Sequence, residues 1–476
     1  MSDIRIKNFI NGAWEDPIDH QWLDNVNPTS QVKINLVARS GHQDIDRAVK
    51  AGREAFEPWA KMHIKDRADY LRSIADAVQA RFEEFALAES QDTGKPLWLS
   101  KKLDIPRAIA NFRFFADCVE KQASDFKNTS IEGHLITQEP VGIAALITPW
   151  NLPLYLLTWK IAPALAYGNT VVCKPSELTS TTAHLLTECL QEAKLPKGVC
   201  NMVYGLGHEA GRALVMHADV SLVSFTGGTQ TGRTIQKDIS DQFKKVSFEL
   251  GGKNSLIIDQ TVDLDQIIGD VIRACFWNQG QICLCAERLL IHESIYNEFK
   301  NKFVEETKNL KVGDPLDETH FMGPLISKEH LKKVQGCIEF RMQAGARLLA
   351  GDEALEDRPG NFMRPTILEG LDSKHTLHHE EIFGPVVTLE PYENIKNVIS
   401  YINASPYGLC ASIFSSDTSK GQSIAKELKV GTVWINTWLK RDLRVPFGGM
   451  KSSGLGREGG QDSIDFFTEK KVICKT

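Results

Sequence analysis

The chain has 476 residues, more than one hydrophobic core supports, so we expect two large domains, with or without an appendage. Hydrophobic residues make up 42% and charged residues 24%, as in ordinary soluble globular proteins. The net charge of −6 excludes a broad basic field for nucleic acid, although local arginines remain available for anionic substrates.

The ten cysteines are scattered along the chain without the paired spacing of a zinc site. Cys283 and Cys285 form a C-x-C pair, which suits a metal or redox site or, more simply, one additional buried thiol. The N-terminal residues lack an apolar signal region. The sequence therefore predicts free thiols in a reducing compartment, most simply the cytosol, and no metal site.

One apolar run, residues 141–159, has the length of a membrane span. Pro149, Asn151 and Pro153 interrupt this run, and Lys160 ends it. We therefore interpret it as a strand, a loop and a buried helix, and expect no membrane partner.

The first 140 residues predict strands, then helices, then a polar hairpin. Short strands and turns are expected over 5–40, and helices over 45–91, where alanine and aliphatic residues recur at helix spacing. Pro96 and Pro106 separate the next helices, and alternation over 133–137 indicates a hairpin.

Two alternations of strands and helices follow. The first has apolar strands at 141–147, after 168, and at 199–204 and 220–225, with a helix that Ser176 caps and that runs to Ala193. The second has strands near 255–258, 361–367, 386–390 and 410–415, helices near 268–276, 294–309, 328–344 and 417–428, and a tail strand over 464–475. This pattern predicts an α/β protein with two doubly wound, mostly parallel sheets and a small β arm.

Three segments carry the groups that carbonyl chemistry needs. A thiol at Cys283 can attack a carbonyl carbon, an amide at Asn151 can hold the oxyanion, and a carboxylate at Glu249 can activate water. Each of these three residues also has an interpretation without a catalytic role. Asn151 can cap the helix that begins near Pro153, Glu249 can simply end a strand before a glycine bend, and a cysteine is often packing.

Two other cysteines compete with Cys283 as nucleophile. Cys275 lies within an apolar helix and is predicted to be core. Cys285 shares a face with Cys283 if the chain is extended there and points away if it is helical. Cys283 is favoured because it directly follows the glycine-containing turn at 279–281, from which a side chain can project into a cleft.

Taken in order, these segments resemble the aldehyde dehydrogenase superfamily, with P-W-N-x-P at 149–153, E-L-G-G-K at 249–253 and F-x-N-x-G-Q-x-C at 276–283. The resemblance covers nearly the whole chain. It implies that Cys283 forms a thiohemiacetal, that a nicotinamide accepts hydride, and that Glu249 activates the water that hydrolyses the thioester. Asn151 and the backbone N–H of Cys283 would stabilise the oxyanion.

No G-x-G-x-x-G motif follows the first predicted strand, and the segment at 205–211 resembles this motif only weakly. The resemblance implies NAD as cofactor, with a glutamate at the adenosine ribose that disfavours a 2′-phosphate. Many family members have serine at position 228, so Thr229 is the expected substitute at the phosphates. The alternative interpretation of Glu381 is an ordinary surface carboxylate, and this interpretation fits its neighbour Glu380 better. The implied cofactor contacts are Lys174, Glu177, Gly227, Gly228, Thr229, Gly232, Trp150, Leu250, Glu381 and Phe383.

Segments 104–107 and 436–443 resemble the subgroup that oxidises 2-aminomuconate and 2-hydroxymuconate semialdehydes. This resemblance implies that Arg107 and Arg441 hold a substrate carboxylate, which a planar guanidinium can grip through two charge-assisted bonds. A structural salt bridge to Asp104 or Asp442 is the alternative, and Arg444 can substitute for Arg441.

We therefore expect a cytoplasmic NAD-dependent enzyme that oxidises 2-aminomuconate 6-semialdehyde to 2-aminomuconate in tryptophan catabolism through the kynurenine pathway. The alternatives are 2-hydroxymuconate semialdehyde, a broad range of aliphatic aldehydes, or a family member that binds without turnover. Residues 1–120 and 141–251 would bind NAD, and 252–450 would form the catalytic domain. Residues 121–140 and 451–476 would form an oligomerisation arm and tail, in a homodimer or homotetramer.

Overall fold

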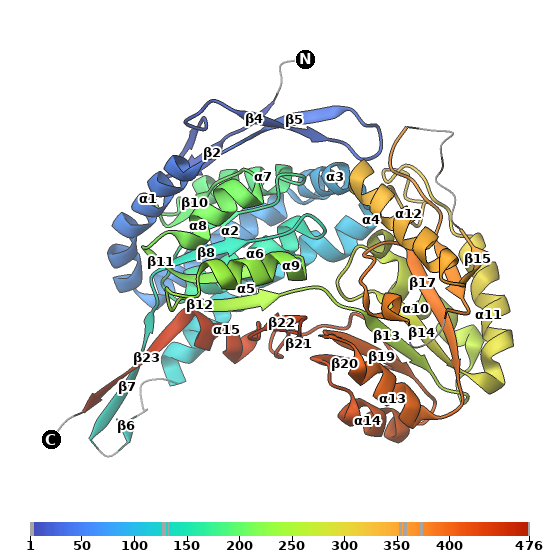
Figure 1. The fold of residues 1–476 in the computed structure, drawn as a ribbon. Helices are drawn as coiled ribbons and strands as arrows, with labels where there is room; N and C mark the ends of the chain where they lie inside the picture. Colours follow the sequence, from blue (N-terminus) through green and yellow to red (C-terminus); the bar gives the residue numbers. More distant parts are fainter. Residues whose placement is uncertain are drawn as a thin grey trace.

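The computed structural model describes residues 4–125, 130–131, 133–351, 355, 359–371 and 375–474, although not the side chains of 122–125 and 130–131. Two α/β lobes lie side by side, and a narrow arm projects from the first lobe at the lower left (Figure 1). Each lobe contains one large, mostly parallel sheet, which confirms the predicted fold class.

The sheet of the first lobe is parallel from β12 to β10, and its outer strands are antiparallel. Because parallel strands point the same way, the residues that follow β8, β9, β11 and β12 meet at one edge. In sheet order, the strands are β22 (Gly454–Leu455), β12 (Lys245–Glu249), β11 (Val220–Thr226), β8 (Ile143–Ile147), β9 (Thr170–Lys174), β10 (Cys200–Met202), β2 (Asn8–Ile10) and β3 (Ala13–Glu15).

Both faces of this sheet are covered, which explains the unbroken apolar strands in the sequence. Alternate residues of β8 point to opposite faces: Ala144 and Leu146 join one buried cluster, and Ile143 and Ala145 join another. Helices supply the other side of each cluster. They are α1 (His42–Lys61), α2 (Ile64–Ala80), α3 (Phe82–Thr93), α4 (Leu97–Leu99), α5 (Ile105–Asp125), α6 (Pro153–Ala166), α7 (Thr181–Glu192), α8 (Arg212–Met216), α9 (Thr229–Asp238) and α15 (Gly460–Phe467), with π-helical segments η1 (Ser100–Asp104) and η3 (Gly207–Gly211).

Helix α6 occupies the centre of the first lobe. Every residue of α6 except Leu156 is buried, and Pro153 stands at its first position, where a missing N–H costs nothing. The apolar run at 141–159 is therefore a strand, a loop and a core helix, as predicted. No described helix is both long and apolar enough to cross a membrane.

The second lobe has a sheet that is parallel except for its edge strand β15. In sheet order, its strands are β15 (Arg347–Ala350), β16 (Thr366–Glu369), β17 (Val386–Tyr392), β14 (Ala286–His292), β13 (Asn254–Ile258), β19 (Cys410–Phe414) and β20 (Thr432–Ile435). Its helices are α10 (Leu264–Phe276), α11 (Glu293–Lys308), α12 (Lys328–Gln343), α13 (Ile395–Ala404) and α14 (Thr418–Glu427), with 3₁₀ segments η4 (Trp277–Gly280) and η5 (Thr376–His379).

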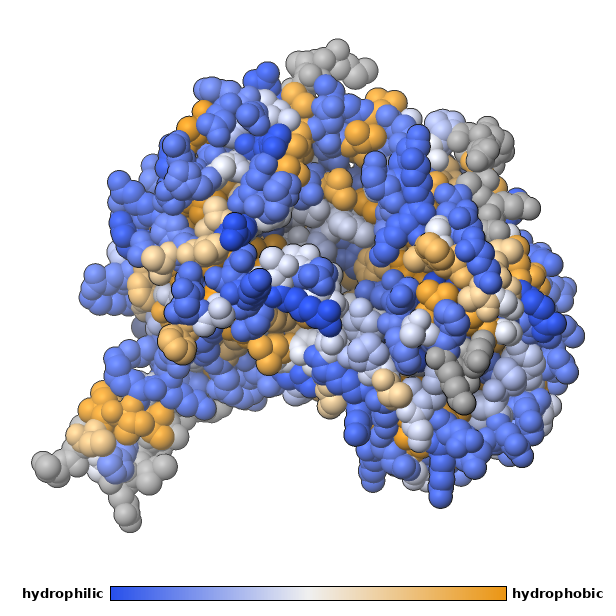
Figure 2. Space-filling view, viewed as in Figure 1, coloured by the Kyte–Doolittle hydropathy of each residue, from blue (hydrophilic) through white to orange (hydrophobic). Residues whose placement is uncertain are grey.

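The arm is a three-stranded sheet of β6 (Ser130–Ile131), β7 (His134–Pro140) and β23 (Thr468–Cys474), in which β23 lies at an edge. Hydrophobic side chains gather on the arm (Figure 2). Val472 and Ile473, both in β23, are 57% and 42% exposed. Residues 126–129, 132 and 475–476 of the predicted arm and tail lie outside the described residues. Two smaller sheets remain: β1 (Arg5–Ile6), β5 (Lys33–Ala38) and β4 (Trp22–Val26), and the pair β18 (Tyr407–Gly408) and β21 (Met450–Lys451).

Three local predictions are wrong. Helix α7 begins at Thr181 after Ser180, so Ser176 does not cap it but accepts the N–H of Leu178 in the preceding turn. The tail is helical to Phe467 and extended only from Thr468, because Ile464 and Phe467 recur at helix spacing and are both buried. The strand expected at 361–367 starts at Thr366, after a proline.

The division of the chain into 1–120 with 141–251, 252–450, and 121–140 with 451–476 stays a prediction. Within the last part, β22 pairs with β12 and α15 contacts α6, so residues 454–467 pack against the first lobe rather than extend with the arm.

A buried charge cluster stabilises the junction between α3 and η1. The ammonium of Lys95 lies 3.0 Å from Asp104 and 3.4 Å from Glu89, and all three side chains are fully buried. Burial raises the pKa of Asp104 to about 7, although the positive charge of Lys95 opposes the shift. The hydroxyl of Thr182 donates to the other oxygen of Glu89.

Replacing Lys95 with methionine should lower the melting temperature by about 3–5 °C, because removing one partner of a buried pair costs ~3–5 kcal/mol. Because the pKa of Asp104 is higher in the folded than in the unfolded state, its contribution to stability is fully present below the ordinary value of 3.8 and is lost as pH rises through about 7. Without Lys95 the charge that lowers this pKa is missing, so the variant loses more stability than the wild type as Asp104 ionises, and the deficit should be larger at about pH 8 than at about pH 5.5. Calorimetry should show almost no change for Lys101→Met, which removes an exposed pair with Glu83. Equal losses in both variants would contradict this account.

Candidate active site

Two cavities meet at the C-terminal edge of the first sheet and share Leu156, Thr226, Glu249 and Cys283 in their linings. We call the first the apolar cavity. It is lined by Leu103, Leu152, Tyr155, Leu156, Trp159, Thr226, Glu249, Ile282, Cys283, Leu284, Leu439, Arg441, Phe447 and Glu458. We call the second the strand-edge cavity. It is lined by Pro149, Trp150, Asn151, Leu156, Thr226, Gly227, Gly228, Glu249, Leu250, Gly251, Cys283, His330, Lys333, Glu381 and Phe383.

A tight left-handed turn after α10 brings Cys283 to both cavities. Asn278 and Gln279 have φ of 51° and 58°, and Gly280 has φ of 69°. A Cβ on Gly280 would lie only 2.2 Å from the carbonyl oxygen of Gly384, so the close approach of the two loops requires glycine there. The turn reverses the chain between α10 and β14 and leaves Cys283 half-buried at the shared wall.

The competing cysteines are packed away from this wall. Cys275 is 1% exposed within α10, and Cys285 is 3% exposed, with its sulfur 3.7 Å from the carbonyl oxygen of Trp277. Neither residue lines either cavity. All ten cysteines lie in the described part of the chain and are free thiols. Cys283 is therefore the thiol that a ligand in either cavity can reach.

Asn151 is tied to the Cys283 loop rather than to its own helix. The N-cap of α6 is Leu152, without a side-chain hydrogen bond, so the capping interpretation of Asn151 is wrong. The amide of Asn151 donates to the carbonyl of Gln281 at 2.9 Å, and its backbone carbonyl accepts from Asn278 at 3.0 Å. An amide nitrogen carries two hydrogens, so one remains for a ligand oxygen.

Burial controls the electrostatics at the shared wall. Burial, and secondarily the charges of Glu249 and Glu381, raise the pKa of Cys283 to about 12, whereas Arg441 acts in the opposite direction. Burial and the neighbouring charge of Glu458 raise the pKa of Glu249 well above its usual range. Cys283 is therefore a thiol at neutral pH, and Glu249 has the raised proton affinity of a general base.

A buried ion pair lies beside Glu249. Lys160, on α6, contacts Glu458 at 2.7 Å and donates to Ser224 at 2.8 Å. This pair was not predicted, because Lys160 only ends an apolar run in the sequence and nothing in its spacing points to Glu458. The pair places a positive charge near Glu249, and this charge partly offsets the upward shift of its pKa.

The β11–α9 junction offers an open cradle at a helix N-terminus. Gly227 donates its N–H to the carbonyl of Glu249 at 3.0 Å, and a Cβ on Gly228 would meet nothing within 4 Å. A Cβ on Gly232 would lie 2.7 Å from Leu250, so glycine lets α9 approach that residue closely. The hydroxyl of Thr229 donates to the carbonyl of Ser452 at 3.4 Å, which does not favour its predicted role as a phosphate donor.

The loop that contains Glu381 forms the opposite wall of the strand-edge cavity. Glu381 accepts the N–H of Gly252 at 2.8 Å, and its pKa is raised to about 7 by burial and then by the charge of Glu287. Glu381 is therefore not a surface carboxylate, whereas its neighbour Glu380 is exposed. The ring of Phe383, whose φ is 61°, lies 5.4 Å from the ring of Trp150.

His330 and Lys333 also line the strand-edge cavity and were not predicted. The Nε2 atom of His330 lies 2.7 Å from the carbonyl oxygen of Phe383, and its ring packs against Trp150. Both residues come from α12, and the sequence carries no local motif there. Only the tertiary packing of α12 against the Glu381 loop brings them to the cavity.

The predicted ribose contacts Lys174 and Glu177 lie at the end of β9, but neither lines the two cavities. Lys174 donates to the carbonyls of Pro175 and Gly205, each at 2.8 Å, and lies 3.6 Å from the carboxylate of Glu177. Lys174 is thus held by the backbone, and Glu177 keeps a partly exposed carboxylate beside it.

Of the two predicted carboxylate-binding arginines, Arg441 lines the apolar cavity, whereas Arg107 does not line it but packs on Tyr155, which does. The guanidinium of Arg441 lies 3.5 Å from the centre of the Phe447 ring, and that of Arg107 lies 5.4 Å from the centre of the Tyr155 ring. Neither has a carboxylate within ion-pair distance among the residues that the structure describes. Arg444 instead grips Asp442 with two hydrogen bonds and is 78% exposed.

These contacts argue against the alternative in which Arg107 and Arg441 form structural salt bridges. Asp104 is occupied by Lys95, and Asp442 by Arg444. Within the described ranges, no group of three or more His, Cys, Asp or Glu side chains is arranged to hold a metal ion. The site therefore combines a reachable thiol, a carboxylate of raised proton affinity, an anchored amide and two cationic side chains that stack on aromatic rings.

Known proteins are similar to this chain in architecture and in sequence. The model of the aldehyde dehydrogenase family matches residues 14–473. The 2-aminomuconic semialdehyde dehydrogenase of Danio rerio is 45% identical over 481 residues, which cover 99% of this chain and 98% of that protein. The 2-hydroxymuconic semialdehyde dehydrogenase of Pseudomonas sp. (strain CF600) is 42% identical and covers 98% of this chain and 99% of its own. The solved NAD+ complex of an aldehyde dehydrogenase from Bacillus cereus is 37% identical, with a TM-score of 0.95 and coverage of 98% and 96%. This chain belongs to the aldehyde dehydrogenase family.

Proposed function

We propose that this protein oxidises a carboxylated aldehyde to the carboxylic acid with NAD as hydride acceptor. The observation that carries the proposal is the position of Cys283 and Glu249 in the wall common to both cavities. A substrate in the apolar cavity and a cofactor in the strand-edge cavity would meet at the same thiol. This arrangement suits covalent catalysis followed by hydride transfer.

The strand-edge cavity fits a nicotinamide dinucleotide. Gly228 leaves the N-terminus of α9 open, and the dipole of a helix favours phosphate there. Glu381 and Phe383 would hold the nicotinamide ribose, with Trp150 and Leu250 beside the ring. Lys174 and Glu177 would contact the adenosine ribose, where a glutamate disfavours the 2′-phosphate of NADP. Gly227, Gly228 and Gly232 complete the proposed set, with Thr229 contributing its backbone at the start of α9 rather than its hydroxyl.

The proposed chemistry follows from the positions of three side chains. The sulfur of Cys283 bonds to the aldehyde carbon and loses its proton to solvent, while the oxyanion accepts hydrogen bonds from Asn151 and the backbone N–H of Cys283. A bound NAD supplies the acceptor for the hydride that leaves this carbon. A thioester on Cys283 remains. Glu249 then takes a proton from water, which attacks the thioester and releases the acid and the thiol.

The apolar cavity favours an unsaturated carbon chain with an anionic end. Aromatic and aliphatic side chains would enclose the chain, and Arg441 in the cavity wall would hold its carboxylate, together with Arg107 from behind Tyr155. Relatives named for 2-aminomuconic semialdehyde support 2-aminomuconate 6-semialdehyde as substrate. The relative named for 2-hydroxymuconic semialdehyde supports that compound as the second candidate.

We further propose a homodimer or homotetramer in the cytoplasm that serves tryptophan catabolism through the kynurenine pathway. The edge strand β23, with exposed Val472 and Ile473, supports the assembly, because an uncovered edge pairs readily with another chain. The ten free cysteines support a reducing compartment.

Glu249→Ala should release one equivalent of NADH and then stop, because the thioester forms but is not hydrolysed. Steady-state turnover should fall by about 10³-fold or more, the usual scale for a lost general base. NADH absorbance measures the burst, and mass spectrometry should find an acyl adduct on Cys283. An unmodified protein after a normal burst would disprove this role, and Cys283→Ser should give neither burst nor adduct.

Arg107→Ala and Arg441→Ala should each lower kcat/KM for 2-hydroxymuconate semialdehyde by about 100-fold, because a charge-assisted pair is worth ~3 kcal/mol. The same variants should change kcat/KM for hexanal by less than about threefold, since this aldehyde has no carboxylate. Arg444→Ala is the matched control and should leave both substrates unaffected. Parallel losses for the two aldehydes would remove the clamp from the mechanism.

NAD should bind more tightly as pH rises through about 7, because Glu381 must be ionised to accept hydrogen bonds from the ribose. Below that value the proton blocks one acceptor oxygen, and above it both are available. Titration calorimetry between about pH 6 and pH 8 measures the trend. Glu381→Gln should flatten it, and a wild-type protein with no such trend would refute the assignment.

A further inference from the structure

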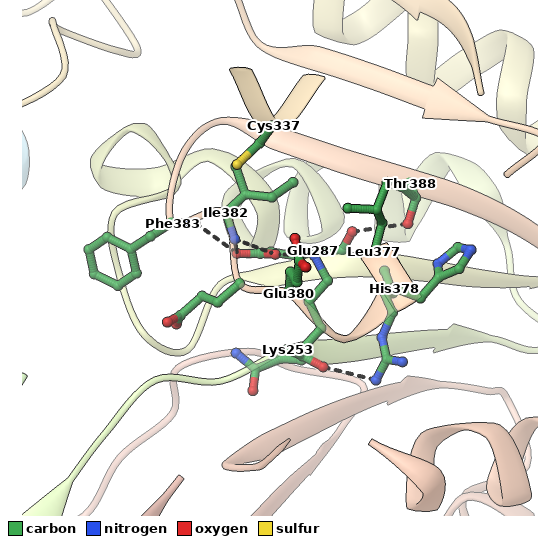
Figure 3. Close-up of polar contacts among 12 residues, drawn as sticks. Lys253, Glu287, Cys337, Leu377, His378, Glu380, Ile382, Phe383 and Thr388 are labelled. Carbon is green, nitrogen blue, oxygen red and sulfur yellow. Dashed lines mark hydrogen bonds and ion pairs between the residues drawn. The ribbon is translucent and has the colours of Figure 1, made fainter. Parts of the chain in front are cut away.

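Glu287 is a buried carboxylate that the mechanism does not use. It lies near the start of β14, shortly after Cys283, and is 5% exposed. It forms an ion pair with Lys253, which follows the Glu249 segment and is 3% exposed. Figure 3 shows Glu287 between Lys253 and the loop that contains Ile382 and Phe383.

The same carboxylate accepts two backbone N–H groups of that loop. The N–H of Ile382 lies 3.0 Å and 3.1 Å from the two oxygens of Glu287, and the N–H of Phe383 lies 3.0 Å from one of them. A carboxylate with a cation and two N–H donors is well satisfied, which is what a buried charge requires. Glu287 therefore connects Lys253 and the Glu381 loop at one point.

The loop needs such an anchor because its conformation is strained. Phe383 has φ of 61°, a region that side chains other than glycine rarely adopt, and strain of this kind persists only where surrounding contacts hold it. Glu287 binds the N–H of Phe383, and His330 contacts its carbonyl. The strained residue places its ring against Trp150 in the strand-edge cavity.

We propose that Glu287 is a positioning residue for the cofactor: its carboxylate seats the 381–383 loop so that Glu381 and Phe383 face the strand-edge cavity. This inference rests on the proposed function, since it assigns NAD to that cavity. Glu287 acts through the loop and does not touch the reacting atoms. Its negative charge also contributes, after burial, to the raised pKa of Glu381.

Glu287→Gln keeps the size of the side chain but removes its charge and replaces one acceptor oxygen with a donor. The loop should then loosen. Hydrogen exchange at the amides of Ile382 and Phe383 should accelerate by about tenfold or more, and the Kd and KM for NAD should rise by about tenfold. Hydrolysis of p-nitrophenyl acetate needs only Cys283 and Glu249, without NAD, and should stay within about twofold of wild type.

Glu369→Gln is the matched control. Glu369 is a buried carboxylate in the same sheet, paired with Lys300, but it is bonded to Tyr296 and Arg347 rather than to the 381–383 loop. This variant should change neither the exchange of the loop amides nor the Kd for NAD. If Glu287→Gln does not fold, the double variant with Lys253→Met removes both charges together and should show the same loosened loop.

Unchanged exchange at 382–383, or an unchanged Kd for NAD, in a folded Glu287 variant would overturn the proposal. Equal losses of NAD reduction and ester hydrolysis would also overturn it, because they would indicate general damage to the site. Failure of wild-type protein to bind NAD would instead refute the proposed function, which the same titration distinguishes.

Discussion

The hydrogen bond from the amide of Asn151 to the carbonyl of Gln281 is the contact on which the site depends. Asn151 follows a strand of the first lobe, whereas Gln281 precedes Cys283 in the second lobe. The return bond from Asn278 to the backbone of Asn151 makes the connection reciprocal. The thiol is thus placed against the edge of the first sheet by the same residue that is proposed to stabilise the oxyanion, so position and chemistry cannot vary independently.

Several buried carboxylates lie around this junction. Glu249 and Glu381 both line the strand-edge cavity, and burial raises the pKa of each. Two lysines, Lys160 and Lys253, are buried against other carboxylates near them. The result is a wall in which proton affinity is set by burial and by neighbouring charge.

Much of the fold could be predicted from the sequence, because local signals suffice for it. Residues 141–147 are apolar without alternation, as a strand covered on both faces must be, and they contain β8. Residues 220–225, in which only Ser221 and Ser224 are polar, belong to β11. The segments around Cys283 and Glu249 were also recognisable from short motifs. The prediction was wrong where contacts with residues distant in the sequence decide between helix and strand. Ile464 is an example: it lies in α15 and is buried in the core of the first lobe.

Pairs that are distant in sequence escaped prediction for the same physical reason. Lys160 and Glu458 are unremarkable along the chain and meet only after β22 and α15 fold back on the first lobe. His330 reaches the strand-edge cavity only through α12. The choice between Arg441 and Arg444 likewise required the structure, since one side chain lies against Phe447 and the other grips Asp442.

The pairing of β23 with β7 has a consequence for how the polypeptide matures. The partners in this ladder, such as Thr468 with Pro140, come from distant parts of the chain. Because translation proceeds from the N-terminus, β7 emerges from the ribosome long before its neighbour exists. A nascent chain therefore carries an uncovered edge on β7 until β23 has been synthesised and pairs with it. Chains that terminate before β23 would keep that edge uncovered and would be prone to aggregation or degradation.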